Sequence, residues 1–571
     1  NLDRFSRKFS KVRLGIALGG LVVVGLLNYL VGEMAVWIAL AVIIIAFMIV
    51  ARYHDQVEGS LKRHRIWRKT KSVHIARMTL CWKNLPEPSV DSPPPEHPFD
   101  SDLNLTGVRS LHRLVNVAGS KGGSERLREW LLNPVTEQIQ VRERQALVQE
   151  LIPRSLFRDK LELNGVCVAD EMDDRWDGTT VCRWLDRHQP TIPLKPYLIT
   201  LSLLSLTNFT LYLLYVFLFI PGWWPISFTA YVLIYLALYS VKRSEMDSLD
   251  ADASLLESNL KPFRSILLYL ESYPMKHTPC LAKHCLPLHS AGGKPSTLLK
   301  EISWIAAGAK WQKGQLLWLA INALVPCDLY FTNRLHCFRE QLREHLPLWL
   351  ETWYDLEAYS ALAGLGFQNP DAIMPEVVEE VSDGNPVFMT RSLAHPLLPF
   401  KDRISNDFTF ARVPDIAIVT GSNMSEKSTF LRTIGINLCL AYAGGPVLAT
   451  SFRTIPFRLF TSMTVSDSVT DGISYFYAEV KRLKALLDAL EVSHSRPLFF
   501  LIDEIFRGTN NRERLQGSRA YIRSLVEKHG VGIVATHDLE LVNLEDEITD
   551  IVNYHFIEEV LNGSMVFDYL L

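Results

Sequence analysis

Long apolar runs occur at two places along the chain, and at each place they form a pair. The first pair covers residues 14–50 and is broken only by the polar segment 28–33. The second covers residues 197–241 and is interrupted at residues 221–225, which contain two prolines and a glycine. Each run approaches the ~20 residues that an α-helix needs to cross the bilayer core. The pattern predicts two transmembrane hairpins, four spans in all.

Lysine and arginine side chains flank the outer ends of both predicted hairpins. They are Arg4, Arg7, Lys8, Lys11 and Arg13 before the first run, Arg52, Lys62, Arg63, Arg65, Arg68, Lys69 and Lys71 after the second, Lys195 before the third, and Lys242 and Arg243 after the fourth. The turn at residues 32–33 carries none. The positive-inside rule then predicts that both termini and all the large segments are cytoplasmic.

Two alternatives to membrane spans are open. A signal peptide would explain the first run, but a second run follows at once and no small-residue cleavage site is evident. Helical hairpins buried in the core of a soluble protein would explain both pairs.

The rest of the chain changes its pattern twice. After the predicted hairpin and its basic flank (residues 1–75), residues 76–102 contain a cluster of prolines, which predicts an extended linker because proline lacks an N–H donor and blocks helix. Residues 103–376 repeat apolar positions at spacings of three and four. They predict an all-α core interrupted by the second hairpin at about 197–241.

Residues 377–571 show a different pattern of apolar and polar positions. Short apolar runs at 416–419, 498–502 and 531–535 are bounded by Gly, Pro and Asp and alternate with helical stretches. Such alternation predicts an α/β domain with a mainly parallel sheet.

Composition narrows the possible classes of protein. Lys and Arg number 59 and Asp and Glu 62, so the net charge of −3 excludes a globally basic nucleic-acid coat, although not a local basic face. Charged residues make up 21% and hydrophobic residues 48%, which excludes wholesale disorder. The 8 cysteines follow no regular framework and fit a reducing compartment.

A candidate phosphate-binding loop follows the first of the three apolar runs. Residues 421–429 read G-S-N-M-S-E-K-S-T and lead into a helical pattern, which is the strand–loop–helix order of such loops. Backbone amides and the helix N-terminus would point at the phosphates of ATP. Lys427 is expected to reach the β and γ phosphates, and the Ser428 hydroxyl to bind Mg²⁺. The other predicted nucleotide contacts are Gly421, Asn423, Met424, Ser425, Glu426 and Thr429. The alternative is an ordinary serine-rich turn.

Glu426 departs from the loop pattern GxxxxGK[ST], which expects glycine at this position. Glutamate adds a Cβ and a carboxylate near the phosphates. At ~5 Å and an effective dielectric constant of ~20, repulsion between two like charges is about 3 kcal/mol if the side chain faces the ligand. The substitution therefore predicts ATP binding with hydrolysis weakened or abolished.

Two further runs end in residues that suit phosphate chemistry. Residues 498–502 are apolar and lead into Asp503, expected in the Mg²⁺ shell, and Glu504, expected to polarise the attacking water. The run at 531–535 leads into His537, a candidate sensor of the γ phosphate or the water. The alternatives are solvated acids at a strand end and a structural histidine.

These segments together resemble the ATPase domain of the MutS family of DNA mismatch-repair proteins. The resemblance rests on residues 421–432, 503–509 and 535–537, and on residues 472–476 with Glu479, which look like the family's signature segment. Residues 119–134 resemble the start of the MutS core or lever domain, and residues 394–396 the segment that enters the ATPase domain.

The resemblance implies an α/β P-loop ATPase domain of the ABC type, preceded by an all-α lever or core domain. It also implies ATP and Mg²⁺ as cofactors, and a homodimer with composite ATPase sites in which Ser474 approaches the γ phosphate of the other subunit. A helix after Ser474 with one apolar face fits that arrangement, although a purely intrachain helix is the alternative. By the same resemblance the polymer ligand would be mismatched or branched DNA.

The chain also departs from the repair proteins. No mismatch-reading domain stands before residue 103, predicted spans occupy that place, and Arg403 stands where the family has the aromatic that stacks on adenine. We therefore expect a membrane-anchored MutS-like branch, multi-pass in a bacterial inner membrane, with a cytoplasmic ATPase domain and ATP-dependent DNA binding. The alternative is a membrane scaffold or nucleotide switch that binds ATP without DNA and with little hydrolysis.

Overall fold

The structure is a computed structural model that describes residues 2–30, 33–88, 97–134, 137–172, 175–186, 194–218, 222–247, 249–289, 294–309, 321–379, 384–421, 426–463, 475–492, 494–507, 509–526, 528–556, 558–561, 564–567 and 571. It divides into two compact units, Asn1–Asn84 and Leu85–Leu571. Residues 89–96 of the proline-rich linker predicted at 76–102 lie outside the described residues. The described remainder is not wholly extended as predicted, since it includes the end of a long helix at Met78, a 3₁₀ turn at Trp82–Asn84 and a short helix at Asp100–Leu103.

The first unit is a helical hairpin, as its apolar pattern predicts. Helices α1 (Leu2–Leu30) and α2 (Glu33–Met78) pack along each other, and a short 3₁₀ turn, η1 (Trp82–Asn84), follows. The two helices approach closely at Gly20, where an added Cβ would lie 2.7 Å from Cγ2 of Ile43. The helical segments Phe9–Leu26 and Val36–Met78 each contain a window long and apolar enough to span a membrane, and these windows are 6% and 0% buried.

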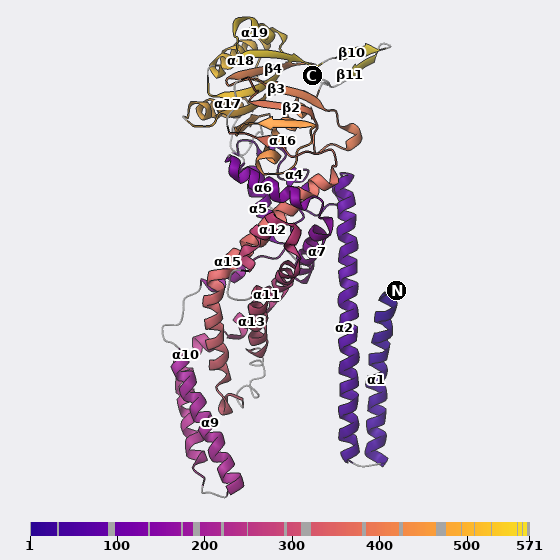
Figure 1. Ribbon diagram of the computed structural model, residues 1–571, viewed down its shortest axis with the longest axis vertical. Helices are drawn as coiled ribbons and strands as arrows, with labels where there is room; N and C mark the ends of the chain where they lie inside the picture. The colour runs from indigo at the N-terminus through magenta and orange to yellow at the C-terminus, as the bar shows by residue number, and fades with distance from the viewer. Residues whose placement is uncertain are drawn as a thin grey trace. The chain divides into compact units, whose positions relative to one another are not determined.

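The second unit begins with helices, in agreement with the predicted all-α core. They are α3 (Asp100–Leu103), α4 (Leu111–Val115), α5 (Lys121–Leu132), α6 (Gln138–Leu151), α7 (Ser155–Met172), α8 (Thr179–Leu185), α9 (Lys195–Leu218), α10 (Trp224–Asp247), α11 (Leu249–Ser272), α12 (Pro279–His284), α13 (Pro295–Ala309) and α15 (Cys327–Gln368). The long helix α15 contacts most of the others (Figure 1). Trp353 of α15 packs in a buried aromatic cluster with Trp176 and Phe263.

A buried carboxylate joins α15 to α5. Glu357 accepts hydrogen bonds from the backbone N–H of Gly119 (2.9 Å) and of Ser120 (3.3 Å), and from the Ser120 hydroxyl. Ser120 is also the N-cap of α5. Burial raises the pKa of Glu357 to about 7. This contact fixes the start of the segment at residues 119–134 against the long helix.

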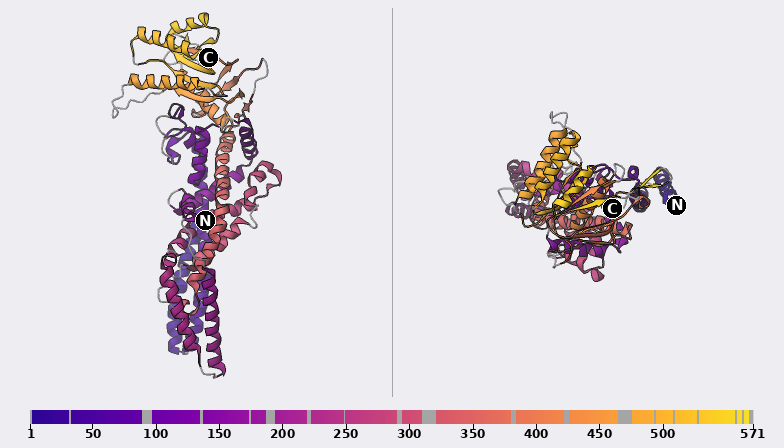
Figure 2. Two further views of the ribbon diagram at one scale, coloured as in Figure 1. Left: turned by 90° about the vertical axis from the view of Figure 1, so that its left-hand side faces the viewer. Right: turned by 90° about the horizontal axis from the view of Figure 1, so that it is seen from above.

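Helices α9 and α10 form the second hairpin and lie side by side in both side views (Figures 1 and 2). Lys195–Phe217 is long and apolar enough to cross a membrane, and its most apolar window is 6% buried. Trp224–Ser240 is a shorter apolar helix. Among the described residues, 3 helices rather than the predicted four therefore reach the length and composition of a membrane span.

The α/β region begins with a two-residue strand, and its described strands form two larger sheets and one two-stranded sheet. The larger has five parallel strands in the order β6 (Arg458–Ser462), β7 (Leu498–Asp503), β8 (Gly530–Thr536), β4 (Asp415–Thr420) and β9 (Ile551–His555). The smaller has the order β1 (Glu376–Val377), β5 (Ser451–Thr454), β2 (Phe388–Leu393) and β3 (Asn406–Phe410). A short hairpin, β10 (Glu558–Leu561) and β11 (Ser564–Phe567), stands apart from both. The three predicted apolar runs are β4, β7 and β8, so the predicted parallel sheet is confirmed.

Adjacent residues of β7 show how the larger sheet is covered. Phe500 belongs to a buried cluster with Leu486 of α17 (Tyr475–Glu491) and Ile522 of α18 (Asn511–Leu525). Phe499 points to the opposite face, as alternation along a strand requires. There it contacts the rings of Phe388 and Phe410 from the smaller sheet. Helix α16 (Lys427–Tyr442) also contacts β7, and α19 (Leu544–Glu547) precedes β9.

Candidate nucleotide site

The predicted phosphate loop connects β4 to α16. Gly421 follows β4, Glu426 is the N-cap of α16, and Lys427 is the first residue of the helix. The strand–loop–helix context of the prediction is therefore present. Of the predicted loop contacts, Asn423, Met424 and Ser425 lie outside the described residues.

Lys427 lies at the carboxyl edge of the sheet. Its ammonium donates to the Gly421 carbonyl at 2.8 Å and lies 3.3 Å from Nδ1 of His537, which follows β8. Nδ1 of His537 is in turn 3.0 Å from the Gly421 carbonyl. The loop lysine and the predicted sensor histidine are thus brought together, although 110 positions separate them in the sequence.

Ser428 and Asp503 meet at the same edge. The Ser428 hydroxyl donates to Oδ2 of Asp503 at 2.6 Å. Strand β8 lies between β4 and β7. Because parallel strands present their carboxyl ends at one edge of a sheet, residues that follow β4, β7 and β8 converge there. The two predicted metal-binding groups are therefore in direct contact.

Glu504 completes the cluster with an arginine that the prediction did not assign to the site. Glu504 Oε1 lies 2.9 Å from Nε2 of His537, and its Oε2 lies 3.1 Å from Nε of Arg507. The same guanidinium lies 2.9 Å from Oδ2 of Asp503. The backbone N–H of Arg507 donates to the buried carboxylate of Glu479 at 3.1 Å. Arg507 therefore offsets the repulsion between the two acids, and its position three and four residues after them was the available signal.

Glu426 adopts a left-handed backbone conformation, with φ 56° and ψ 32°. Residues with a Cβ rarely adopt this conformation, which costs roughly 1–2 kcal/mol. The Glu426 side chain is exposed and lines a small hollow of about 30 Å³. The hollow is also lined by Leu393, His395, Leu398, Asp402, Ile404, Asn406, Thr429, Phe430, Thr433 and Phe556.

The cationic side chains of Arg403 and Arg432 lie near His395, which lines this hollow. Burial, together with the charges of Arg432 and Arg403, lowers the pKa of His395 to about 4, so its ring is neutral at pH 7. Arg403 donates to the carbonyl of Leu398 at 2.8 Å and to Oδ1 of Asn369 at 3.0 Å. These contacts occupy the guanidinium that stands where the resemblance expects an aromatic ring.

Ser474, the predicted contact to a second subunit, lies outside the described residues. The helix that follows it is present as α17. Its apolar face packs into its own domain, with Leu483 and Leu490 buried. Phe476 and Tyr477, at the start of the helix, are exposed.

The sequence of this α/β region matches a known family. Residues 417–571 match the family model "MutS domain V". This part of the chain therefore carries a domain of the MutS family. The matched range includes most of β4 and all of α16, β7 and β8. It therefore includes every described residue of the nucleotide site except those lining residues of the hollow that precede residue 417.

Several curated MutS proteins are similar to part of this chain. "DNA mismatch repair protein MutS" of Aquifex pyrophilus is 29% identical over 200 residues, which are 34% of this chain and 23% of that protein. The protein of the same name from Chloroflexus aurantiacus is 28% identical over 285 residues, 48% of this chain and 28% of that protein. "DNA mismatch repair protein MutS 2" of Halobacterium salinarum is 31% identical over 169 residues, 29% of this chain and 19% of that protein. The matches thus span about a quarter of these relatives' length.

Proposed function

We propose that this chain is a membrane-tethered ATPase of the MutS family that binds ATP and Mg²⁺ at the carboxyl edge of its parallel sheet. The observation that carries the proposal is the contact between Ser428 and Asp503, beside Lys427, Glu504 and His537. A hydroxyl, a metal-binding acid, a phosphate-binding lysine and a second acid are the groups that phosphoryl transfer needs within one site.

The donor set suits magnesium. Mg²⁺ prefers hard oxygen ligands, and the Ser428 hydroxyl and an Asp503 carboxylate oxygen lie 2.6 Å apart. When bound, the ion would neutralise charge that develops on the transferred phosphoryl group. Ser428 and Asp503 would hold it.

The remaining groups have roles that follow from their chemistry. Lys427 would bind the β and γ phosphates through its ammonium. Glu504 would accept a proton from the attacking water. His537, whose Nε2 lies 2.9 Å from the Glu504 carboxylate, would hold that carboxylate in place. Glu426 would weaken hydrolysis, because its carboxylate stands at the N-terminus of α16, where the phosphates are expected.

Membrane tethering is supported by where the apolar side chains lie. The most apolar windows of the three long apolar helices are between 0% and 6% buried. A soluble protein of this composition would bury such surface, whereas a bilayer covers it. With the flanking lysines and arginines, the proposal places the ATPase domain on the cytoplasmic side.

DNA binding and a homodimer with shared sites are proposed from the names of the relatives and from the family resemblance. Several relatives are named DNA mismatch repair proteins. If the chain binds mismatched or branched DNA, its affinity should fall steeply with salt concentration because phosphate contacts release counterions. Absence of DNA binding at low salt would leave a nucleotide switch without DNA.

The nucleotide proposal is tested by ATP binding to the full chain in lipid nanodiscs. Lys427→Ala should reduce the affinity for Mg·ATP by at least about 100-fold, because a buried cation in contact with phosphate is lost. Lys528→Ala is the matched control, since Lys528 precedes β8 at the opposite edge of the same sheet. Retained affinity in Lys427→Ala would overturn the site.

A second candidate function is a membrane scaffold that binds ATP with little hydrolysis. Glu426 at the helix N-terminus is the observation that favours it. ATP binding with no phosphate release, in the presence and absence of DNA, would support this candidate over the first.

A further inference from the structure

Several polar and apolar side chains at the start of α15 and just before it occupy inverted positions, although Leu329 is buried against α9 and α10. We call residues 321–330 the lever tip. Leu324, Val325 and Tyr330 are exposed, at 66%, 51% and 42%, whereas Asn322 and Asp328 are 1% and 0% exposed. Soluble proteins place such residues the other way round. Asp328 is the sole Asp, Glu, Lys or Arg in this segment.

The buried polar groups of the lever tip bond to the second hairpin. Tyr235 of α10 donates to Oδ2 of Asp328, and Tyr231 donates to the Asn322 carbonyl at 2.7 Å. Ser205 of α9 donates to the carbonyl of Leu324. Apolar helices in a bilayer gain nothing from burying apolar surface against each other, so interhelical hydrogen bonds of this kind hold them together.

The hairpin shows the same inversion beside these contacts. Leu206 and Phe209 of α9 are exposed, whereas Tyr231 of α10 is fully buried. Between α9, α10 and the lever tip lies a cavity of about 750 Å³, whose lining includes Phe209, Tyr212, Trp224, Phe228 and Leu324. Water gains little in such an apolar space, and hydrocarbon chains suit it.

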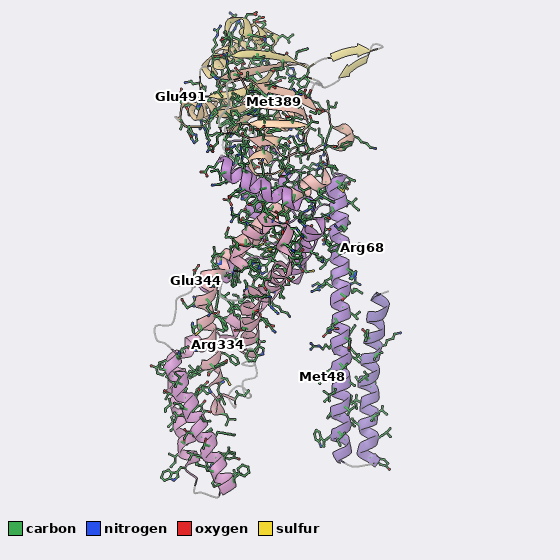
Figure 3. The ribbon with its side chains drawn as sticks, in the orientation of Figure 1. Met48, Arg68, Arg334, Glu344, Met389 and Glu491 are labelled. Atoms are coloured by element: carbon green, nitrogen blue, oxygen red, sulfur yellow. The ribbon has the colours of Figure 1, made fainter. Side chains whose placement is uncertain are left out.

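Further along α15 the ordinary pattern returns. Leu342 and Leu346 are buried, and Arg343 and Glu344 are exposed. Arg334 is the first charged residue after Asp328, and its guanidinium lies 4.8 Å from the ring centre of Phe338. Arg334 and Glu344 are labelled along this helix in Figure 3. An arginine with an apolar stem and a charged head that lies over an aromatic ring suits a bilayer surface.

We propose that the lever tip is itself embedded in the bilayer beside the α9–α10 hairpin. Acyl chains of phospholipids cover Leu324, Val325 and Tyr330 and fill the cavity, and the bilayer surface crosses α15 near Arg334. The proposal rests on the proposed membrane tether. It means that α15, about 60 Å long at 1.5 Å per residue, joins the bilayer directly to the helices beneath the nucleotide site.

The test places a fluorescent amino acid at position 324 of the full chain in phosphatidylcholine–phosphatidylglycerol nanodiscs. Position 348 is the matched control, because Leu348 is likewise an exposed leucine, at 54%, and lies on α15 beyond Arg334. Position 209 in α9 reports on the hairpin itself. Doxyl-labelled lipid should quench the probe at 324 and 209 at least five-fold more than iodide does, and the ratio should reverse at 348.

The possible results separate the two proposals. Quenching by iodide at 324 with quenching by lipid at 209 would overturn the embedded tip and leave the tether standing. Quenching by iodide at both positions would overturn both. Protection at 324 from both quenchers would show that protein, such as a second copy of the chain, covers the tip, and would overturn lipid as the occupant. Mg·ATP binding by each labelled chain shows that it has folded.

Discussion

The carboxyl edge of the parallel sheet and the α9–α10 hairpin sort polar and apolar side chains in opposite ways. In the sheet, β4, β7 and β8 are buried along their whole length, and the charged groups collect where the strands end. In the hairpin, Leu206 and Phe209 are exposed, whereas Tyr231 and Tyr235 are buried and their hydroxyls bond to polar partners. Both patterns follow if exposed side chains match the polarity of the surrounding medium, with water around the first region and lipid around the second.

The largest effect is expected at the polar edge. Glu504→Gln keeps the shape of the side chain but cannot accept a proton, so ATP turnover should fall by roughly 10²–10⁴-fold with ATP binding retained. Phosphate release would be measured in the native chain and with Glu426→Gly, which should raise the starting rate. Glu513→Gln, at the start of α18, is the control. Undiminished turnover in Glu504→Gln would remove the proposed base.

A pair of phenylalanines tests the two surroundings directly. Phe499→Ala removes a fully buried ring from between the two sheets and should cost about 3–5 kcal/mol of folding stability. Phe209→Ala removes a ring that is 60% exposed on α9 and should leave the unfolding of the ATPase domain unchanged. Denaturant unfolding of each variant in detergent, followed by loss of ATP binding, gives the comparison. Equal loss in both variants would mean that the hairpin is part of a soluble core.

The helical core offers a smaller, pH-dependent effect. Burial raises the pKa of Glu357 from 4.5 to about 7, so between these values the folded chain keeps a proton that the unfolded chain has lost. The stabilising contribution is complete below pH 4.5 and is lost as the pH rises through 7, by at most about 3 kcal/mol. The thermal midpoint of the native chain should therefore fall between pH 5.5 and 8.

The thermal midpoint of the Glu357→Gln variant should fall less over that pH interval, because the amide of glutamine does not titrate. Its absolute stability should be lower at pH 5.5, since an amide cannot accept from Gly119 and Ser120 with both of its terminal atoms. An equal slope with pH in both chains would assign the titration to another group.

The smallest effect on stability is expected at Glu426, and two variants separate its causes. Glu426→Ala removes the carboxylate and keeps a Cβ at φ 56°, whereas Glu426→Gly removes both. Glycine should add about 1 kcal/mol of stability and alanine nearly none. A rise in ATP turnover in both variants would assign the impairment to charge, and a rise in glycine alone to backbone conformation. No rise in either would show that Glu426 does not limit hydrolysis.

Much of the fold followed from local patterns. The runs at 416–419, 498–502 and 531–535 do not alternate between apolar and polar residues, because both faces of their sheet are covered. Their continuous apolar character therefore predicted these strands correctly. The helical hairpins were also predicted from unbroken apolar runs, because an apolar run of that length forms few structures other than a helix. The count of four spans was less secure, because the length of Trp224–Ser240 falls short of the others.

The sequence also predicted which residues meet at the edge of the sheet, because the loop lysine, the hydroxyl and the acids each follow a strand. Arg507 was missed as a member of the site, since a charged residue after a strand reads as solvated until its partners are placed. The lever tip was missed because ten residues of mixed character show neither a span nor an amphipathic helix.

The sequence by itself determined which segments are helix, which are parallel strand, and which residues stand at strand ends, because these depend on local spacing and on apolar content. The tertiary structure alone decided that Ser428 touches Asp503, that Arg507 pairs with both acids, and that Asp328 is buried against Tyr235. Those contacts join residues 75, 4, 3 and 93 positions apart, respectively, and only the strand order and helix packing bring the distant ones within hydrogen-bonding distance.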